Sequence, residues 1–176
     1  MKVHIGCGKD PRKGYTTCDI RAMDGNIDIV CPAWELSKHA NGVEEIYSRH
    51  MVEHLTRSEF CCTLQDWYKS LQQGGLLHII CPDLDYHMDQ LRNVVWTDEV
   101  WDDPWSNGKH GLAGLYGSQH ECQPNHWNYE SKTKYWDVHK SGYTTGLMEY
   151  LLQKYGYKKI ECTTDQAHLI AKAYKP

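Results

Sequence analysis

The sequence has no basic stripe, no long apolar run and no paired cysteine motif, and each absence excludes a class of protein. Lys and Arg number 19 against 23 Asp and Glu, a formal charge of -4, whereas a general nucleic-acid binder is expected to be basic. No apolar run approaches the roughly 18 residues of a membrane span, and the first residues lack the apolar core of a signal peptide. We therefore expect a cytoplasmic protein with no nucleic-acid or membrane partner.

The eight cysteines are not spaced as metal or disulfide motifs. No two of them form a Cys-x-x-Cys pair, and they are too sparse for a small secreted domain held by disulfides. Most fall within or at the end of apolar stretches. They are typical of reduced, buried, small hydrophobic side chains in a cytosolic protein.

What is present is an ordinary globular composition. Hydrophobic residues make up 40% and charged residues 24% of the 176 residues, so disorder is not expected. This length can bury a substantial core without cross-links. We predict one domain over residues 1–176, without internal repeats.

Short β-prone runs alternate with helical patterns, which predicts an α/β fold with a mostly parallel sheet. The capping-box spacing of Thr56 and Glu59 predicts a helix that ends at Gly74-Gly75. The following run, 76–81, is almost continuously apolar, as a strand buried on both faces should be. Strands are expected at 2–5, 16–20, 27–31, 44–48, 76–81, 157–162 and 168–174, and further helices at 85–95 and 144–155. The last two strands are joined by five residues, too few for a crossover, so they should form an antiparallel hairpin.

The first strand leads into a turn with two glycines, Gly6 and Gly8. Such a turn lets the backbone approach a ligand closely, and a nucleotide-like cofactor is the ligand we expect. Eleven residues after Gly8, the second strand carries Asp19 near its end, where a carboxylate can accept hydrogen bonds from ribose hydroxyls. The alternative is a solvated turn aspartate. Pro11 and Gly14 interrupt the interval, so any helix there is shortened to a turn or two.

This order of features resembles the Rossmann-like S-adenosylmethionine-dependent methyltransferases, most closely the small bacterial and phage-type enzymes of the broad type 11 group. The similar motifs are Ile5-Gly6-Cys7-Gly8, Gly14-Tyr15 with Cys18-Asp19-Ile20, Ser48-Arg49-His50-Met51-Val52-Glu53-His54-Leu55, Gly74-Gly75 before Ile79-Ile80-Cys81-Pro82-Asp83-Leu84, and His139-Lys140-Ser141-Gly142-Tyr143-Thr144. The resemblance spans nearly the whole chain. It implies a seven-stranded sheet with a C-terminal antiparallel hairpin and S-adenosylmethionine over the first strand.

The resemblance also implies a set of cofactor-binding residues. They are Gly6, Cys7, Gly8, Asp19, Ile20, Cys31, Pro32 and His50. The glycine turn would border the methionine portion, Asp19 would hold the ribose, and His50 would flank the sulfonium. Cys31 and Pro32 would lie near the adenine, where many relatives carry an acidic residue that this chain lacks.

The segment at about 96–140 is predicted to be an aromatic-rich acceptor-site insertion. It holds Trp96, Trp101, Trp105, Trp127 and Trp136. Aromatic faces suit a sugar ring or a flat metabolite, although these residues could simply pack on the sheet. The expected reaction is O-methylation of a small molecule or of a sugar or polysaccharide unit.

A hydroxyl acceptor must lose its proton, and a histidine of near-neutral pKa suits that task. His139 is the first catalytic candidate, followed by Asp83 and His87.

Two other functions stay open at this point. One is a non-catalytic nucleoside-binding module on the same fold. The other is a zinc hydrolase, because His50, Glu53 and His54 match an inverted zinc-protease helix. A strand before this motif and a capping box after it leave little helix for the ligands, so we predict no metal at His50 and His54. A grouping of His120, Cys122 and His126 is a minor metal option.

Overall fold

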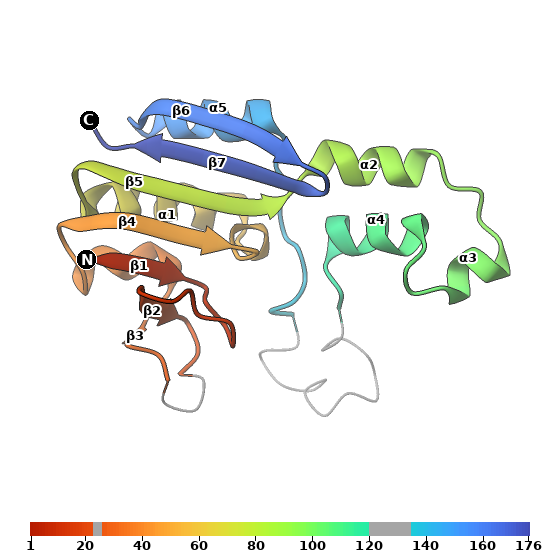
Figure 1. The fold of residues 1–176 in the computed structure, drawn as a ribbon, viewed down its shortest axis with the longest axis horizontal. Coiled ribbons are helices and arrows are strands. Elements are labelled where there is room, and N and C mark those ends of the chain that lie inside the picture. The colour runs from red at the N-terminus through yellow and green to blue at the C-terminus, as the bar shows by residue number, and fades with distance from the viewer. Residues whose placement is uncertain (23–25, 120–134) are drawn as a thin grey trace.

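The computed structural model describes residues 1–22, 26–119 and 135–176, which form a seven-stranded sheet of order β3-β2-β1-β4-β5-β7-β6 (Figure 1). The strands are β1 (Lys2–Ile5), β2 (Thr16–Asp19), β3 (Ile29–Val30), β4 (Val43–Arg49), β5 (Leu71–Pro82), β6 (Lys158–Asp165) and β7 (His168–Tyr174). The helices are η2 (Ala33–Lys38), η3 (Val52–His54), α1 (Arg57–Ser70), α2 (Leu84–Arg92), α3 (Asp98–Asp102), α4 (Asn107–Tyr116) and α5 (Thr145–Lys154). Only β7 runs against the other described strands, so the mostly parallel sheet with a C-terminal hairpin is confirmed.

The core lies between the sheet and the helices of one face. Helices α1 and α5 lie on the same side of the sheet, and η2 packs beside α1 (Figure 1). Phe60, Leu64 and Trp67 of α1 are almost fully buried, as are Met148 and Leu152 of α5. Within the described residues, no helix covers the opposite face in Figure 1.

This one-sided cover corrects the prediction that the apolar run of β5 is buried on both faces. Leu77, Ile79 and Cys81 are at most 1% exposed, whereas the alternate residues His78 and Ile80 are half-buried. Because successive side chains of a strand point to opposite faces, only one set reaches the helices.

The predicted start of α1 is confirmed and its predicted end is wrong. Thr56 Oγ1 accepts from the Glu59 backbone N–H, and the Glu59 carboxylate accepts from the Thr56 N–H. The helix ends at Ser70, because Leu71 is extended and already pairs with Val43. The two glycines that were expected to stop α1 instead lie inside β5, at an irregularity in its pairing with β4.

The chain between β5 and α5 contains more helix than the sequence pattern indicates. Helix α2 leaves the carboxyl end of β5, and α4 packs against it. Helix α4 contains Gly108, Gly111 and Gly114, which hide its helical pattern. In the interval between Gly6 and Tyr15 there is no helix, which confirms the shortened connection.

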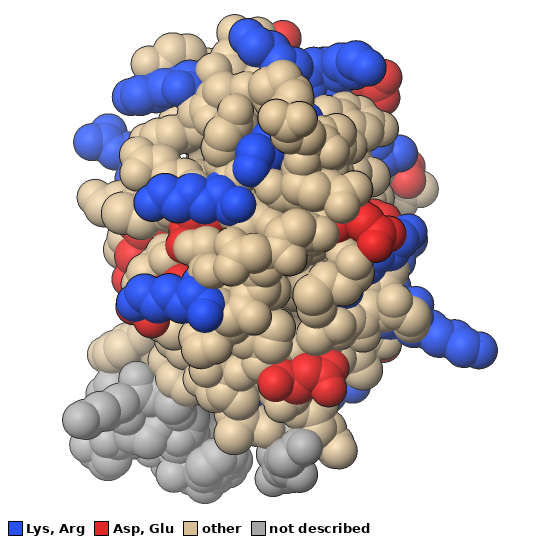
Figure 2. All heavy atoms as spheres, turned by 90° about the vertical axis from the view of Figure 1, so that its left-hand side faces the viewer, with Lys and Arg blue, Asp and Glu red and all other residues tan. Residues whose placement is uncertain are grey.

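Charges of both signs are spread over the face at the amino ends of β1, β4 and β5, where uncharged residues separate them (Figure 2). That face carries no single basic stripe. Among the described helices, none is both long and apolar enough to cross a membrane.

Candidate functional site

Two neighbouring cavities lie toward the carboxyl ends of the parallel strands, where open α/β sheets bind their ligands. The first has a volume of about 390 Å³. It is lined by Ile5, Gly6, Asp19, Ile20, Arg21, Cys31, Ala33, Trp34, His50, Met51, His54, Leu55, Glu59, Trp136, Asp137 and Lys140. Five of the eight predicted cofactor residues are among them, while Cys7, Gly8 and Pro32 are not.

The glycine turn after β1 is held by backbone contacts. Gly6 has φ +66° and its N–H donates to the Cys18 carbonyl at 2.8 Å. A Cβ on Gly6 would lie 2.1 Å from Cγ of Met51, whereas a Cβ on Gly8 would meet nothing within 4 Å. Gly6 is therefore required by the approach of Met51 as well as by its backbone angle.

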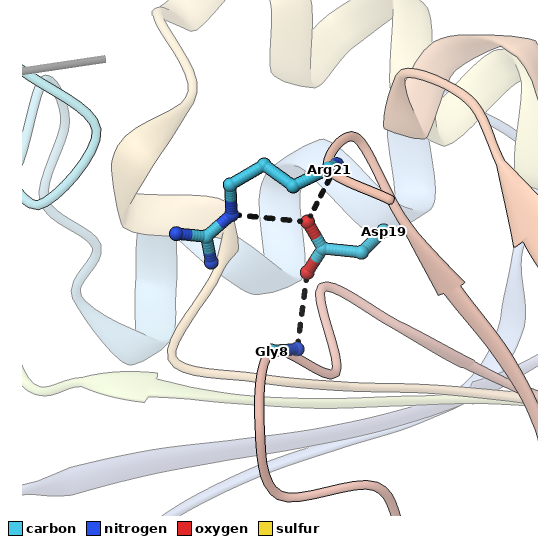
Figure 3. Close-up of polar contacts among 3 residues, drawn as sticks. All are labelled: Gly8, Asp19 and Arg21. Carbon is cyan, nitrogen blue, oxygen red and sulfur yellow. Dashed lines mark hydrogen bonds and ion pairs between the residues drawn. The ribbon is translucent and has the colours of Figure 1, made fainter. Parts of the chain in front are cut away.

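Asp19 anchors this turn from the end of β2 (Figure 3). Its Oδ2 accepts from the Gly8 N–H at 3.0 Å, and its Oδ1 accepts from the Arg21 N–H at 2.9 Å and from Arg21 Nε at 3.4 Å. Asp19 is only 4% exposed, yet it lines the first cavity. A carboxylate offers about four acceptor positions, so one remains for a ligand hydroxyl.

The far end of the first cavity is made by the segment after β3. Cys31, Ala33 and Trp34 line it, whereas Pro32 precedes η2 as its N-cap residue and does not. Sγ of Cys31 lies 3.7 Å from Sγ of Cys18 in the core. A thiol and an indole thus line this end of the cavity, and the adenine contact predicted for Cys31 and Pro32 stays a prediction.

The second cavity, of about 350 Å³, is rich in histidine. It is lined by His50, Glu53, His54, Pro82, His87, His110, Ala113, Gly114, Ser118, Asp137, His139, Ala167 and His168. Burial lowers the pKa of His54, His87 and His168, so these three imidazoles are neutral at pH 7. His50, His54 and Asp137 line both cavities and form their common wall.

His50 occupies a strained position in this wall. Its φ is +49°, in the left-handed region that non-glycine residues rarely adopt. Its Nδ1 lies 3.2 Å from Oε1 of Glu53, and its ring packs against the ring of His168 with centroids 4.9 Å apart.

The three catalytic candidates are not equivalent. His139 lines the second cavity, its Nδ1 donates to the Gly114 carbonyl at 2.8 Å, and its ring lies 5.0 Å from that of His54. His87 also lines it, but burial and the neighbouring His110 lower its pKa to about 4, which makes it a weak base. Asp83 lines neither cavity; it caps α2 by accepting from the Asp85 N–H.

The described tryptophans of the predicted insertion do not gather around one cavity; Trp96 and Trp101 pack edge to face, with ring centroids 6.1 Å apart. Trp96 is half-exposed and packs against Gly108, and Trp101 and Trp105 are exposed; all three line neither cavity. Trp136 lines the first cavity, 5.2 Å from the Arg21 guanidinium. Trp127 and the grouping of His120, Cys122 and His126 lie outside the described residues, and the acceptor role of the insertion stays a prediction.

Sequence reasoning missed several lining residues. His110 and His168 complete the histidine cavity, and Arg21, Trp34 and Lys140 contribute to the first. The only sequence signal for the two histidines was the abundance of histidine, 11 residues in all. They come from segments far apart in the chain, and only the packing of α4 on α2 and the β6–β7 turn bring the histidines together.

Comparisons with known proteins give a match in structure but not in sequence. No protein-family model matches the chain, and no curated protein matches it in sequence.

A SAM-dependent methyltransferase from Archaeoglobus fulgidus aligns with a TM-score of 0.58 at 13% identity, over 99% of this chain and 85% of that one. A SAM-dependent methyltransferase from Thermotoga maritima, described as a "possible histamine N-methyltransferase", aligns with a TM-score of 0.63 at 12% identity, over 99% and 81%. A "possible exported protein" from Bordetella parapertussis aligns with a TM-score of 0.58 at 14% identity, over 99% of this chain and 61% of that one.

This chain therefore spans less than two thirds of the Bordetella protein. Identities this low establish the fold alone. The strand order, the reversed β7 and these alignments agree, and the chain has the Rossmann-like fold of SAM-dependent methyltransferases.

Proposed function

We propose that the protein is an S-adenosylmethionine-dependent methyltransferase that holds its cofactor in the first cavity and a small-molecule or carbohydrate acceptor in the second. The observation that carries this proposal is the common wall of His50, His54 and Asp137. Methyl transfer from a sulfonium depends mainly on in-line placement of the two reactants. Two adjoining cavities at the carboxyl ends of the strands support that arrangement.

The first cavity fits an adenosyl group. The remaining acceptor position of Asp19 suits a ribose hydroxyl, and Cys31 and Trp34 offer an apolar, aromatic surface for the adenine. His50, in the common wall, is the residue we assign to the neighbourhood of the sulfonium. Cys7 and Gly8 then act through the shape of the turn, since neither lines the cavity.

The second cavity supports O-methylation of a hydroxylated acceptor. Six histidines line it, so the cavity offers hydrogen-bond donors and acceptors. Such a lining suits a hydroxylated ligand better than an apolar one. In the transfer, the acceptor oxygen forms a bond to the methyl carbon, the carbon–sulfur bond breaks with its electron pair returning to sulfur, and the hydroxyl proton leaves. Neutral imidazoles are suited to receive that proton.

The test uses two ligands that differ at one hydroxyl. Wild-type protein should bind S-adenosylhomocysteine more tightly than its 2′-deoxy analogue, because the lost hydrogen bond to a carboxylate is worth about 1.5 to 3 kcal/mol. This corresponds to roughly tenfold or more in affinity. Asp19→Ala should bind both ligands weakly and with nearly equal affinity, as measured by isothermal titration calorimetry.

The preference between the two ligands is the informative quantity, because Asp19 also holds the Gly8 and Arg21 N–H groups. Loss of these two hydrogen bonds lowers the affinity for both ligands by the same factor. Asp10→Ala is the matched control, an exposed aspartate of the same turn, and should keep the wild-type preference. An Asp19→Ala protein that retains the full preference would remove Asp19 from the ribose site.

A further inference from the structure

A buried carboxylate without a full set of partners stands beside the histidine cavity. Glu53 is only 1% exposed and lines that cavity. Its Oε1 lies 3.2 Å from Nδ1 of His50, and no donor within the described part of the chain reaches its Oε2. Burying a carboxylate in this state is costly unless a cation or a donor completes its coordination.

Two imidazoles beside Glu53 are fixed in one orientation by backbone carbonyls. Nδ1 of His54 lies 3.2 Å from the Val138 carbonyl, and Nδ1 of His139 lies 2.8 Å from the Gly114 carbonyl. Because a carbonyl can only accept, Nδ1 of each ring donates its hydrogen to that carbonyl, and Nε2 is the ring nitrogen left to bind a ligand. A carbonyl on the other ring nitrogen is the usual support of a metal-bound histidine.

The three residues converge on one point. One ligand atom from each of Glu53, His54 and His139 lies within 4.8 Å of the other two. Two imidazoles and one carboxylate are the protein ligands of many catalytic zinc sites, which leave a coordination position open. We propose that Glu53, His54 and His139 bind one divalent transition-metal ion of the zinc class, with its open position toward the acceptor cavity.

This proposal departs from the sequence prediction that no metal binds here. That prediction concerned a helix carrying His50 and His54, and η3 is indeed only a three-residue turn. The third ligand comes instead from the segment before α5. In this arrangement His50 is a positioning residue that holds Oε1 of Glu53 and leaves Oε2 for the metal.

The role of the ion rests on the proposed function. An acceptor hydroxyl at the open position would have its pKa lowered, so that its oxygen attacks the methyl carbon after its proton passes to water or to a cavity histidine. His139 would then serve as a ligand, and its loss would weaken metal binding as well as lower turnover.

The test measures zinc binding to the full chain after treatment with a chelator, under reducing conditions, by isothermal titration calorimetry. Glu53→Gln and His139→Ala should each weaken zinc binding on the order of a hundredfold or more. This is a larger loss than the one expected when a residue that only supports a ligand is removed. His110→Ala is the matched control, a histidine of the same cavity outside the ligand set, and should keep wild-type zinc affinity. The His120→Ala/Cys122→Ser/His126→Ala variant should also keep it.

Several outcomes would overturn the metal site. They are the absence of zinc binding by wild-type protein, equal losses of zinc affinity in His110→Ala and His139→Ala, and a loss of zinc affinity confined to the triple variant.

Affinity for S-adenosylhomocysteine, measured on the same metal-free proteins, separates the metal-site proposal from the methyltransferase proposal. Zinc binding without cofactor binding would refute the methyltransferase and leave the metal site standing, and the reverse result would refute the metal site alone. Retained cofactor binding in Glu53→Gln or His139→Ala also shows that the variant is folded.

Discussion

At the scale of single residues, Gly6 and Gly8 belong to the same sequence motif, but glycine is required at the two positions for different physical reasons. Both have positive φ, which disfavours any side chain. Only Gly6 also lies against a packed neighbour, because Cβ and Cγ of Met51 occupy the space that a Cβ would need. The turn is thus specified by its contact with the segment after β4 as well as by its own conformation.

Gly6→Ala should therefore cost more stability than Gly8→Ala. The backbone angle costs each about 1 to 2 kcal/mol, and overpacking adds roughly 1 to 3 kcal/mol at Gly6. Urea unfolding of both variants measures the difference. The control is a double-mutant cycle with Met51→Gly, which removes both Cβ and Cγ, so the extra cost at Gly6 should disappear. An extra cost that persists without the Met51 side chain would contradict the assigned cause.

At the scale of elements, the sequence specifies best those helices whose ends are determined locally. The capping box of α1 was visible as Thr56 and Glu59, and the structure forms both of its hydrogen bonds. The end of α1 was misplaced because it depends on where Leu71 enters the sheet beside Val43. The glycines seen as a stop signal are used inside β5 instead.

Thr56→Ala should destabilise the whole protein by about 0.5 to 2 kcal/mol, since it leaves the Glu59 N–H without its cap. Helix α1 buries Phe60, Leu64 and Trp67 against the sheet, so fraying of its first turn reaches the core. Thr97→Ala removes the equivalent cap from α3, which has no buried residue, and should leave global stability nearly unchanged. Chemical denaturation measures the free energy of unfolding of both variants. A Thr56→Ala loss as small as that of Thr97→Ala would show that the cap of α1 acts only locally.

At the scale of the whole molecule, the site exists because distant segments converge. The wall between the cavities comes from the turn after β4 and from the segment before α5, and the histidine cavity adds α2, α4 and the start of β7. Cofactor binding and acceptor turnover should therefore separate under mutation.

His139→Ala should lower turnover on the order of a hundredfold or more, as expected when a group that activates the acceptor hydroxyl is lost, either as a base or as a metal ligand. Affinity for S-adenosylhomocysteine should stay near wild type, because His139 lines only the second cavity. Steady-state kinetics and calorimetry measure the two quantities, with His39→Ala as the control, an exposed histidine outside both cavities. Unaltered turnover on the true acceptor would return His139 to a structural role.

The sequence by itself determined what depends on neighbours along the chain. It predicted the glycine turn, the cap at Thr56, the acid at the end of the second strand and the antiparallel hairpin, because these follow from a few adjacent residues and from connection length. Only the tertiary structure decided which faces are buried, that Asp83 lines neither cavity, that His87 is a weak base, and that Glu53, His54 and His139 meet. The burial of a face and the meeting of distant side chains are set by packing between segments far apart in the chain. No local sequence pattern specifies the distance between such segments in the fold.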